Sequence, residues 1–144
     1  MTSSVFPDIN VLVALVFDQH RHHEEAVRWY NALDPHTIFA FCRHTQLGLF
    51  RLLSTDTVMG QNAMSLRDCW QVYDDWIDTG QAVLLPEPST IEAELRRRTS
   101  QAMVAPKLWA DAYLAAFTEA AEVTLVTFDR VLAGKVKGAV LLGY

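Results

Sequence analysis

Short apolar runs alternate along this chain with longer stretches in which apolar residues recur every three or four positions. Short runs bounded by Pro, Gly or Asp are typical of strands, and the longer spacing is typical of helices. The predicted strands are residues 5–6, 37–41, 83–85, 123–128 and 139–142. Strands that alternate with helices predict an α/β fold, a three-layer α/β/α sandwich around a central, mostly parallel sheet of four to five strands.

Helices are predicted between these strands, at residues 10–17, 22–33, 45–53, 65–77, 91–99 and 106–121. Residues 54–60 are predicted to be a loop, and Gly134 and Gly138 separate the last two strands. Ser89 is a candidate N-cap, with Glu92 completing a capping box. The aromatic stripe that includes Trp70 and Tyr73 is interpreted as core, with packing in a dimer as the second interpretation.

The composition indicates the general class of protein but leaves its function open. The 144 residues fit one domain, residues 1–144, and 51% hydrophobic with 20% charged residues excludes a disordered chain. A net charge of -5 argues against nucleic-acid binding through a broad basic surface. It does not exclude an enzyme that meets phosphate through a bound metal ion and a local basic rim.

Cysteine content and hydropathy indicate where the protein works. Cys42 and Cys69 form neither a disulfide framework nor a Cys-x-x-Cys pair, which favours two reduced thiols. Nowhere does the chain offer the roughly 20 apolar residues of a membrane span. We therefore expect a cytoplasmic protein with no membrane association.

Three aspartates are the main candidates for chemistry. Asp8 and Asp129 follow predicted strands, and Asp111 lies in a predicted helix. A carboxylate just past a parallel strand points into the crevice where open α/β sheets bind ligands. Carboxylates gathered there repel each other unless they take up protons or a divalent cation neutralises them. The pattern therefore predicts a metal site.

Each aspartate also has a structural interpretation. Asp8 could cap the helix that begins near Ile9, Asp111 could form a salt bridge, and Asp129 could be a turn residue after its strand. Taken singly, these interpretations compete well with metal binding. The three aspartates together favour the metal site.

Four stretches carry a resemblance to a known family, and they span the chain from end to end. They are Asp8-Ile9-Asn10-Val11-Leu12, residues 45–53 (TQLGLFRLL), residues 109–115 (WADAYLA) and residues 124–129 (TLVTFD). In order and spacing they resemble PIN-domain ribonucleases, and specifically the VapC toxins of bacterial toxin-antitoxin pairs. The expected architecture is accordingly a PIN-like sandwich.

The resemblance implies metal-dependent cleavage of RNA, with Mg²⁺ or Mn²⁺ held by Asp8, Asp111 and Asp129. By the same resemblance, Asn10 and Thr127 would contact phosphate or orient the metal ligands, and Thr45 would be a further auxiliary residue. The implied partners are an RNA substrate, a cognate VapB-like antitoxin and a second copy of the chain in a homodimer.

One position departs from the family pattern. Members commonly carry a glutamate three residues before the arginine that matches Arg51, and here that residue is Gly48. Because glycine has no side chain to bind metal, a second metal position is in doubt, and Glu87 and Glu92 are candidate substitutes. The alternative function is a degenerate PIN domain that binds RNA or a partner protein without cleavage.

Other interpretations stay open from the sequence alone. Aspartates at strand ends also occur in small α/β phosphatases and phospho-acceptor domains. The run Arg96-Arg97-Arg98 could contact RNA or could be a solvated helix end. Arg51 could pair with a core acid or contact phosphate.

Overall fold

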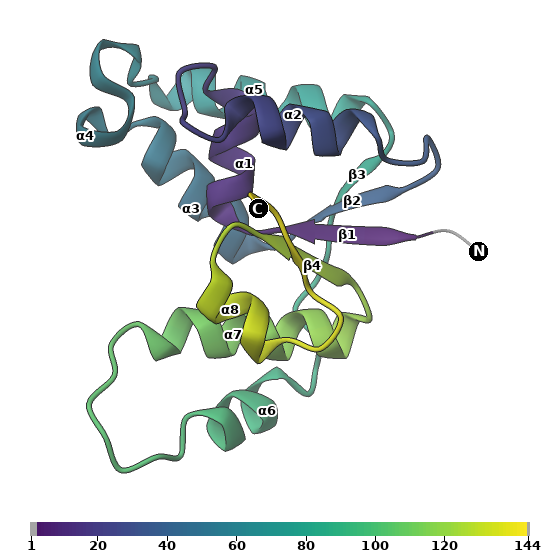
Figure 1. Cartoon of the computed structure of the whole chain (residues 1–144), viewed down its shortest axis with the longest axis vertical. Coiled ribbons are helices and arrows are strands. Elements are labelled where there is room, and N and C mark those ends of the chain that lie inside the picture. The colour runs from purple at the N-terminus through teal and green to yellow at the C-terminus, as the bar shows by residue number, and fades with distance from the viewer. Residues whose placement is uncertain (1–2, 144) are drawn as a thin grey trace.

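A sheet of parallel strands crosses the middle of the computed structural model, which describes residues 3–143 (Figure 1). The strands in chain order are β1 (Ser4–Pro7), β2 (Ile38–Phe41), β3 (Ala82–Leu84), β4 (Thr124–Thr127) and β5 (Val140–Leu141). Their order in the sheet is β3-β2-β1-β4-β5, and every neighbouring pair is parallel. The described residues thus confirm the predicted parallel sheet, with five strands.

Side chains alternate between the two faces of this sheet. Val5, Phe39 and Val126 join one buried cluster, whereas their chain neighbours Phe6 and Leu125 join the other. Because both faces are buried, the centres of these strands are apolar rather than alternating with polar residues. This explains why the sequence shows short apolar runs.

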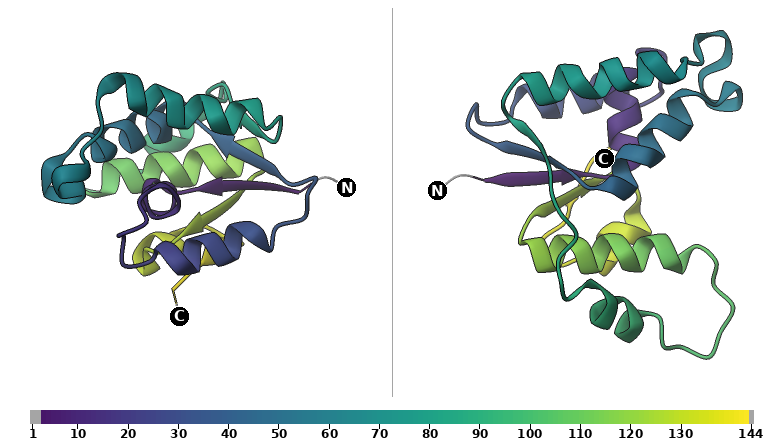
Figure 2. Two further views of the ribbon diagram at one scale, coloured as in Figure 1. Left: turned by 90° about the horizontal axis from the view of Figure 1, so that it is seen from above. Right: turned by 180° about the vertical axis from the view of Figure 1, so that it is seen from behind.

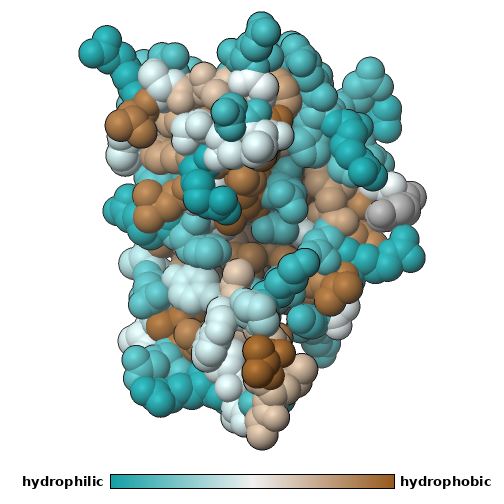
Figure 3. All heavy atoms as spheres, turned by 90° about the vertical axis from the view of Figure 1, so that its left-hand side faces the viewer, coloured by the Kyte–Doolittle hydropathy of each residue, from teal (hydrophilic) through white to brown (hydrophobic). Residues whose placement is uncertain are grey.

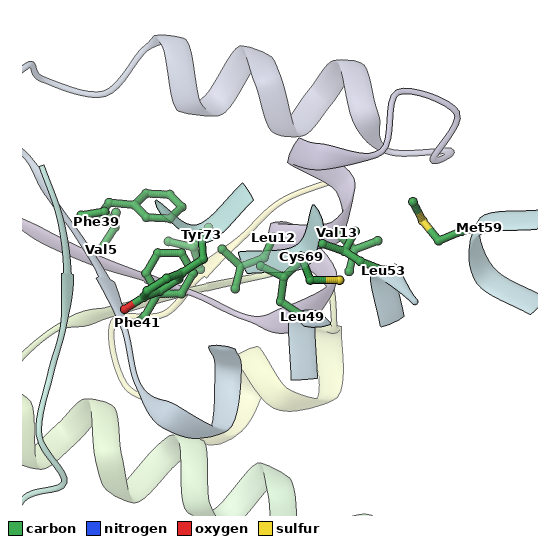
Figure 4. Close-up of a cluster of buried hydrophobic side chains, with 12 residues drawn as sticks. Val5, Leu12, Val13, Phe39, Phe41, Leu49, Leu53, Met59, Cys69 and Tyr73 are labelled. Atoms are coloured by element: carbon green, nitrogen blue, oxygen red, sulfur yellow. The ribbon is translucent and has the colours of Figure 1, made fainter. Parts of the chain in front are cut away.

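Helices cover both faces (Figure 2). The first cluster packs beneath α1 (Ile9–Val16), α2 (His23–Asn31), α3 (Arg43–Leu53) and α5 (Leu66–Asp78), and the second beneath α6 (Ile91–Arg98), α7 (Leu108–Ala121) and α8 (Arg130–Lys135). The predicted three-layer α/β/α sandwich is therefore confirmed. Figure 4 shows the first cluster, in which Leu12 and Val13 of α1 meet Leu49 and Leu53 of α3.

The aromatic stripe of α5 divides between core and surface. Tyr73 is buried, and the ring of Trp76 stacks on Phe39 with 5.4 Å between centroids. Trp70 lies at 4.8 Å from the ring of Phe50 but is 48% exposed. The core interpretation is thus confirmed for Tyr73 and does not hold for Trp70.

Three local predictions were wrong. Residues 54–60 were predicted as a loop but contain α4 (Asp56–Met59) and begin the 3₁₀ turn η1 (Gly60–Asn62). The helix α8 was missed, because Gly134 lies inside it. The N-cap of α6 is Thr90, without a side-chain capping bond, so the capping box from Ser89 does not form.

No helix among residues 3–143 is long and apolar enough to cross a membrane.

Candidate active site

Two of the three aspartates lie at the carboxyl ends of adjacent strands. Asp8 follows β1 directly, and Asp129 is two residues past the end of β4. The strands pair in parallel register, and the backbone N–H of Asp8 donates to the carbonyl of Val126 at 2.8 Å. Figure 3 faces this edge of the sheet, where hydrophilic and hydrophobic side chains are intermixed.

Asp8 is held in a buried position by two hydrogen bonds. Its residue is 7% exposed. Its Oδ1 accepts from the backbone N–H of Ile9 at 2.7 Å, and its Oδ2 accepts from the hydroxyl of Thr127 at 2.8 Å. The helix-capping interpretation is therefore confirmed, since Asp8 is the N-cap of α1. Capping leaves unused lone pairs on both oxygens, so it does not exclude metal binding.

The environment of Asp8 disfavours its charge. Burial raises the pKa of its carboxyl above the ordinary value of 3.8, the two hydrogen bonds lower it, and the charges of Asp129 and Asp111 raise it further. Both other aspartates thus act electrostatically on Asp8. A nearby cation would reverse the repulsion and favour the ionised carboxylate.

Thr127 connects Asp8 with Asp129. Its fully buried hydroxyl donates to Asp8 and accepts from the backbone N–H of Asp129 at 2.9 Å. The Oδ1 of Asp129 in turn accepts from the backbone N–H groups of Val131 and Leu132, at 2.9 and 3.1 Å, and caps α8. Asp129 itself is exposed at the surface.

Asp111 lies in the first turn of α7 and reaches α8. The Nζ of Lys135 donates to its Oδ2 at 3.2 Å, so the predicted salt bridge is present. The side chains of Asp111 and Lys135 are 21% and 38% exposed. An ion pair this accessible contributes little to stability and exchanges readily for another cation.

The auxiliary residues occupy different settings. Thr45 is fully buried, and its hydroxyl bonds within the first turn of α3, where it accepts from the backbone N–H of Cys42 at 3.1 Å. Asn10 is exposed in the first turn of α1, two residues past Asp8. Of the three auxiliary residues, Thr127 is the one whose side chain contacts an aspartate in the described structure.

Gly48 brings α3 close to α1. A Cβ at position 48 would lie 2.2 Å from the Cδ1 and 2.9 Å from the Cγ1 of Ile9. The side chain of Ile9 therefore occupies the space into which the family's glutamate would begin. Glycine at position 48 and isoleucine at position 9 fit each other.

One titratable residue near Asp8, His44, was missed from the sequence. His44 lies four residues before Gly48 and Arg51 three residues after it, so all three share one face of α3. Burial lowers the pKa of the His44 imidazole, the charge of Asp8 raises it, and that of Arg51 lowers it. Helical spacing around the Gly48-Arg51 motif was the signal that could have identified His44.

The candidate substitutes for the missing glutamate are engaged elsewhere. Glu92 pairs with Arg96 at 3.3 Å, and both side chains are 78% exposed. The Oε1 of Glu87 accepts from the hydroxyl of Tyr113 at 2.8 Å. The acidic charges that raise the pKa of Asp8 belong to Asp129 and Asp111 and not to these glutamates.

The arginine run of α6 is paired with acids. Arg97 contacts Glu94 at 2.7 Å, and Arg98 contacts both Glu94 and Glu119. These glutamates neutralise the charge that RNA binding would use. The helix-end interpretation is therefore favoured over an RNA-contacting patch.

The donor chemistry fits a hard divalent cation, although the aspartates are not drawn together in a single shell. Among the described residues, no three acidic, His or Cys side chains are grouped closely enough to hold a metal ion. Carboxylate oxygens suit Mg²⁺ and Mn²⁺, and Mg²⁺ usually keeps several waters. The arrangement is compatible with an ion bound directly by one or two carboxylates and through water by the rest.

Comparison with known proteins decides the family. The model of the PIN domain matches residues 5–137. The chain belongs to the PIN-domain family. Ribonuclease VapC41 of Mycobacterium tuberculosis is 36% identical to this PIN-domain chain over 126 residues, which are 85% of this chain and 86% of that protein.

Solved structures share this PIN fold at low sequence identity. The toxin VapC20 of Mycobacterium tuberculosis, which cleaves the sarcin-ricin loop, has a TM-score of 0.64 at 15% identity, over 90% of this chain and 93% of that one. VapBC-1 of nontypeable Haemophilus influenzae has a TM-score of 0.60 at 10% identity, over 96% of each chain. At these identities the likeness supports the fold, and the resemblance to VapC proteins rests on VapC41.

Proposed function

We propose that this PIN-domain protein is a divalent-metal-dependent endoribonuclease, the toxin of a VapBC-like toxin-antitoxin pair acting in the cytoplasm. The observation that carries the proposal is the buried carboxyl of Asp8, with its raised pKa, linked to Asp129 through the hydroxyl of Thr127. Such an arrangement is costly to fold and is expected where a cation is to be bound.

Asp8, Asp111 and Asp129 would hold the metal ion, which would be Mg²⁺ or, alternatively, Mn²⁺. When bound, the ion lowers the pKa of a water molecule and neutralises charge on the scissile phosphate. Thr127 fixes the orientation of Asp8, and the cap of α8 fixes Asp129. Lys135 pairs with Asp111 in the metal-free protein and so fixes the position of this carboxylate. Asn10, exposed beside Asp8, is available to contact the phosphate.

The non-cleaving alternative rests on Gly48 alone. All three aspartates are present, and Ile9 fills the space that the missing glutamate would enter. Three carboxylates are enough to hold one Mg²⁺ together with its waters. We therefore favour a cleaving enzyme with one principal metal position.

Two protein partners belong to the proposal. A VapB-like antitoxin would restrain the nuclease, in keeping with the VapBC complex among the structural relatives. A second copy of the chain would pack on α3 and α5, where Leu47, Leu66 and Trp70 are 55%, 81% and 48% exposed. Exposed large apolar side chains on two packed helices are typical of a protein interface.

Cleavage of a broad RNA pool tests the function directly. The purified protein should cut RNA with Mn²⁺ or Mg²⁺ and not with EDTA, and Asp8→Asn should abolish cutting and relieve growth arrest on expression. Asp18→Asn is the matched control, because Asp18 is exposed in the turn after α1 and its replacement makes the same chemical change at the far end of that helix from Asp8. Absence of cleavage with either metal, with growth arrest unaffected by Asp8→Asn, would refute the ribonuclease function.

A further inference from the structure

A cavity of about 480 Å³ lies past the carboxyl ends of β2 and β3, the two strands that follow β1 in the sheet. Its walls come from Cys42 and Arg43 after β2, from residues 84–87 at the end of β3, and from Tyr113 and Phe117 of α7. Cavities of roughly 300–1,000 Å³ accept small ligands. The cavity therefore has room for one nucleobase with its sugar.

Two polar groups at this cavity are held in place. The hydroxyl of Tyr113 donates to Oε1 of Glu87 at 2.8 Å, which positions the carboxylate as an acceptor. The Nη1 of Arg43 donates at 2.6 Å to Oε1 of Gln46, an amide that is 1% exposed. An orienting contact on each side chain leaves one free carboxylate oxygen and further guanidinium N–H groups for a ligand.

Aromatic rings connect the cavity with the aspartates. Tyr113 lies two residues past Asp111 on α7, and its ring centroid is 5.4 Å from that of His44. The charge of Asp8 in turn acts on the imidazole of His44 and raises its pKa, against the larger lowering effect of burial. A single RNA strand whose phosphate lies at the aspartates would therefore bring a neighbouring base to this cavity.

We propose that the cavity binds a guanine base of single-stranded RNA, with Glu87 accepting from its Watson–Crick edge and Arg43 donating to its O6. The inference rests on the proposed function and names the substrate feature that the site selects. A phosphate is repelled by Glu87, whereas the accessible apolar walls at Leu84 and Leu85 suit a planar base. Guanine presents two adjacent donors, N1–H and the 2-amino group, beside an acceptor; uracil presents a single donor.

Binding of labelled hexauridylates by the full chain in EDTA tests this inference without cleavage. One internal uridine is replaced by guanosine or by inosine, which lacks only the 2-amino group. We expect the guanosine oligonucleotide to bind roughly tenfold more tightly than the other two. Glu87→Gln should remove this preference, because an amide oxygen can still accept from Tyr113 but cannot replace both acceptors of a carboxylate.

Glu92→Gln is the matched control, since it removes the same charge from an exposed position five residues away. It should keep the guanosine preference. Equal binding of all three oligonucleotides by the unmodified protein would overturn the inference, as would a Glu87→Gln variant that strengthens or weakens all three alike. A guanosine preference without Mn²⁺-dependent cleavage would support guanine binding at the cavity and refute the ribonuclease function. Cleavage without a guanosine preference would support the ribonuclease function and refute guanine binding.

Discussion

The free-energy cost of forming this site in the folded protein falls mainly on the side chain of Asp8. Water reaches 7% of the residue, and its two hydrogen bonds compensate the carboxylate only in part, because its pKa remains raised. Side chains that bind ligands commonly cost stability in the free protein. The ionised Asp8 should therefore destabilise the metal-free fold.

Comparison of the unmodified protein with Asp8→Asn over pH isolates this cost. Below pH 3.8, the ordinary pKa of an aspartate, the carboxyl of Asp8 is mostly protonated in both the folded and the unfolded state. As pH rises, the unfolded state releases its proton first, so the free energy of unfolding falls until the pH passes the raised pKa of the folded state. The stability of the unmodified protein relative to Asp8→Asn should thus fall as the pH rises above 3.8 and level off once it passes the raised pKa, as measured by urea denaturation in EDTA. A relative stability that rises with pH would contradict the burial of an ionised Asp8.

Lys135 is a further residue whose replacement separates stability from metal binding. Because its contact with Asp111 is partly exposed, Lys135→Met should lower the free energy of unfolding by less than about 1 kcal/mol. The same change removes the competing cation from Asp111, so Mn²⁺ should bind more tightly and raise the melting temperature at lower concentration. Lys137→Met, which removes a nearby charge without this contact, is the control. Unchanged Mn²⁺ affinity in Lys135→Met would exclude Asp111 from the metal site.

At the scale of elements, the junction of α1 with α3 depends on two residues. A methyl group at position 48 needs the space of Ile9, which forces the isoleucine to move or the helices to separate. Overpacking of this kind costs about 1–3 kcal/mol, whereas alanine in place of glycine in a helix gains about 1 kcal/mol. The balance between these effects depends on whether Ile9 is present.

A double-mutant cycle measures that dependence. Gly48→Ala should be neutral or destabilising in the unmodified protein and stabilising in an Ile9→Ala background, with a coupling of about 1–2 kcal/mol in chemical denaturation. Gly134→Ala in α8, where a Cβ would meet nothing within 4 Å, is the control and should show no coupling to Ile9. Additive effects of Gly48→Ala and Ile9→Ala would mean that the two helices do not meet there.

At the scale of the whole molecule, the sheet could be predicted because it depends on chain-wide periodicity. The inner strands β1, β2 and β4 are largely buried and leave apolar runs in the sequence, and shorter apolar runs also indicated the edge strands β3 and β5. The helix α8 could not be predicted, since Gly134 lowers local helix propensity and the cap from Asp129 becomes visible only in three dimensions. Ion pairs between residues distant in the sequence, such as Asp111 with Lys135, likewise depend on the tertiary structure.

The residues of the candidate site could be predicted from the sequence, but the contacts between them could not. Strand ends indicated Asp8 and Asp129, Asp111 was a candidate in a predicted helix, and the family resemblance added Thr127. The sequence did not reveal that one hydroxyl bridges Asp8 and Asp129, nor that the charge of Asp8 acts on the imidazole of His44. Those contacts depend on the register of β1 with β4 and on the approach of α3, which no local pattern encodes.

The assembly of the molecule depends on which exposed apolar residues meet a partner. Trp70 and Trp109 are the informative pair, because they are 48% and 62% exposed on different layers, α5 and α7. If the homodimer forms on α3 and α5, Trp70→Glu buries an unpaired charge in its interface and should shift sedimentation from dimer to monomer. Trp109→Glu should leave the dimer intact, since it makes the same change on the opposite layer. Dissociation by Trp109→Glu alone would place the interface beside Asp111, where a second copy would cover the candidate site.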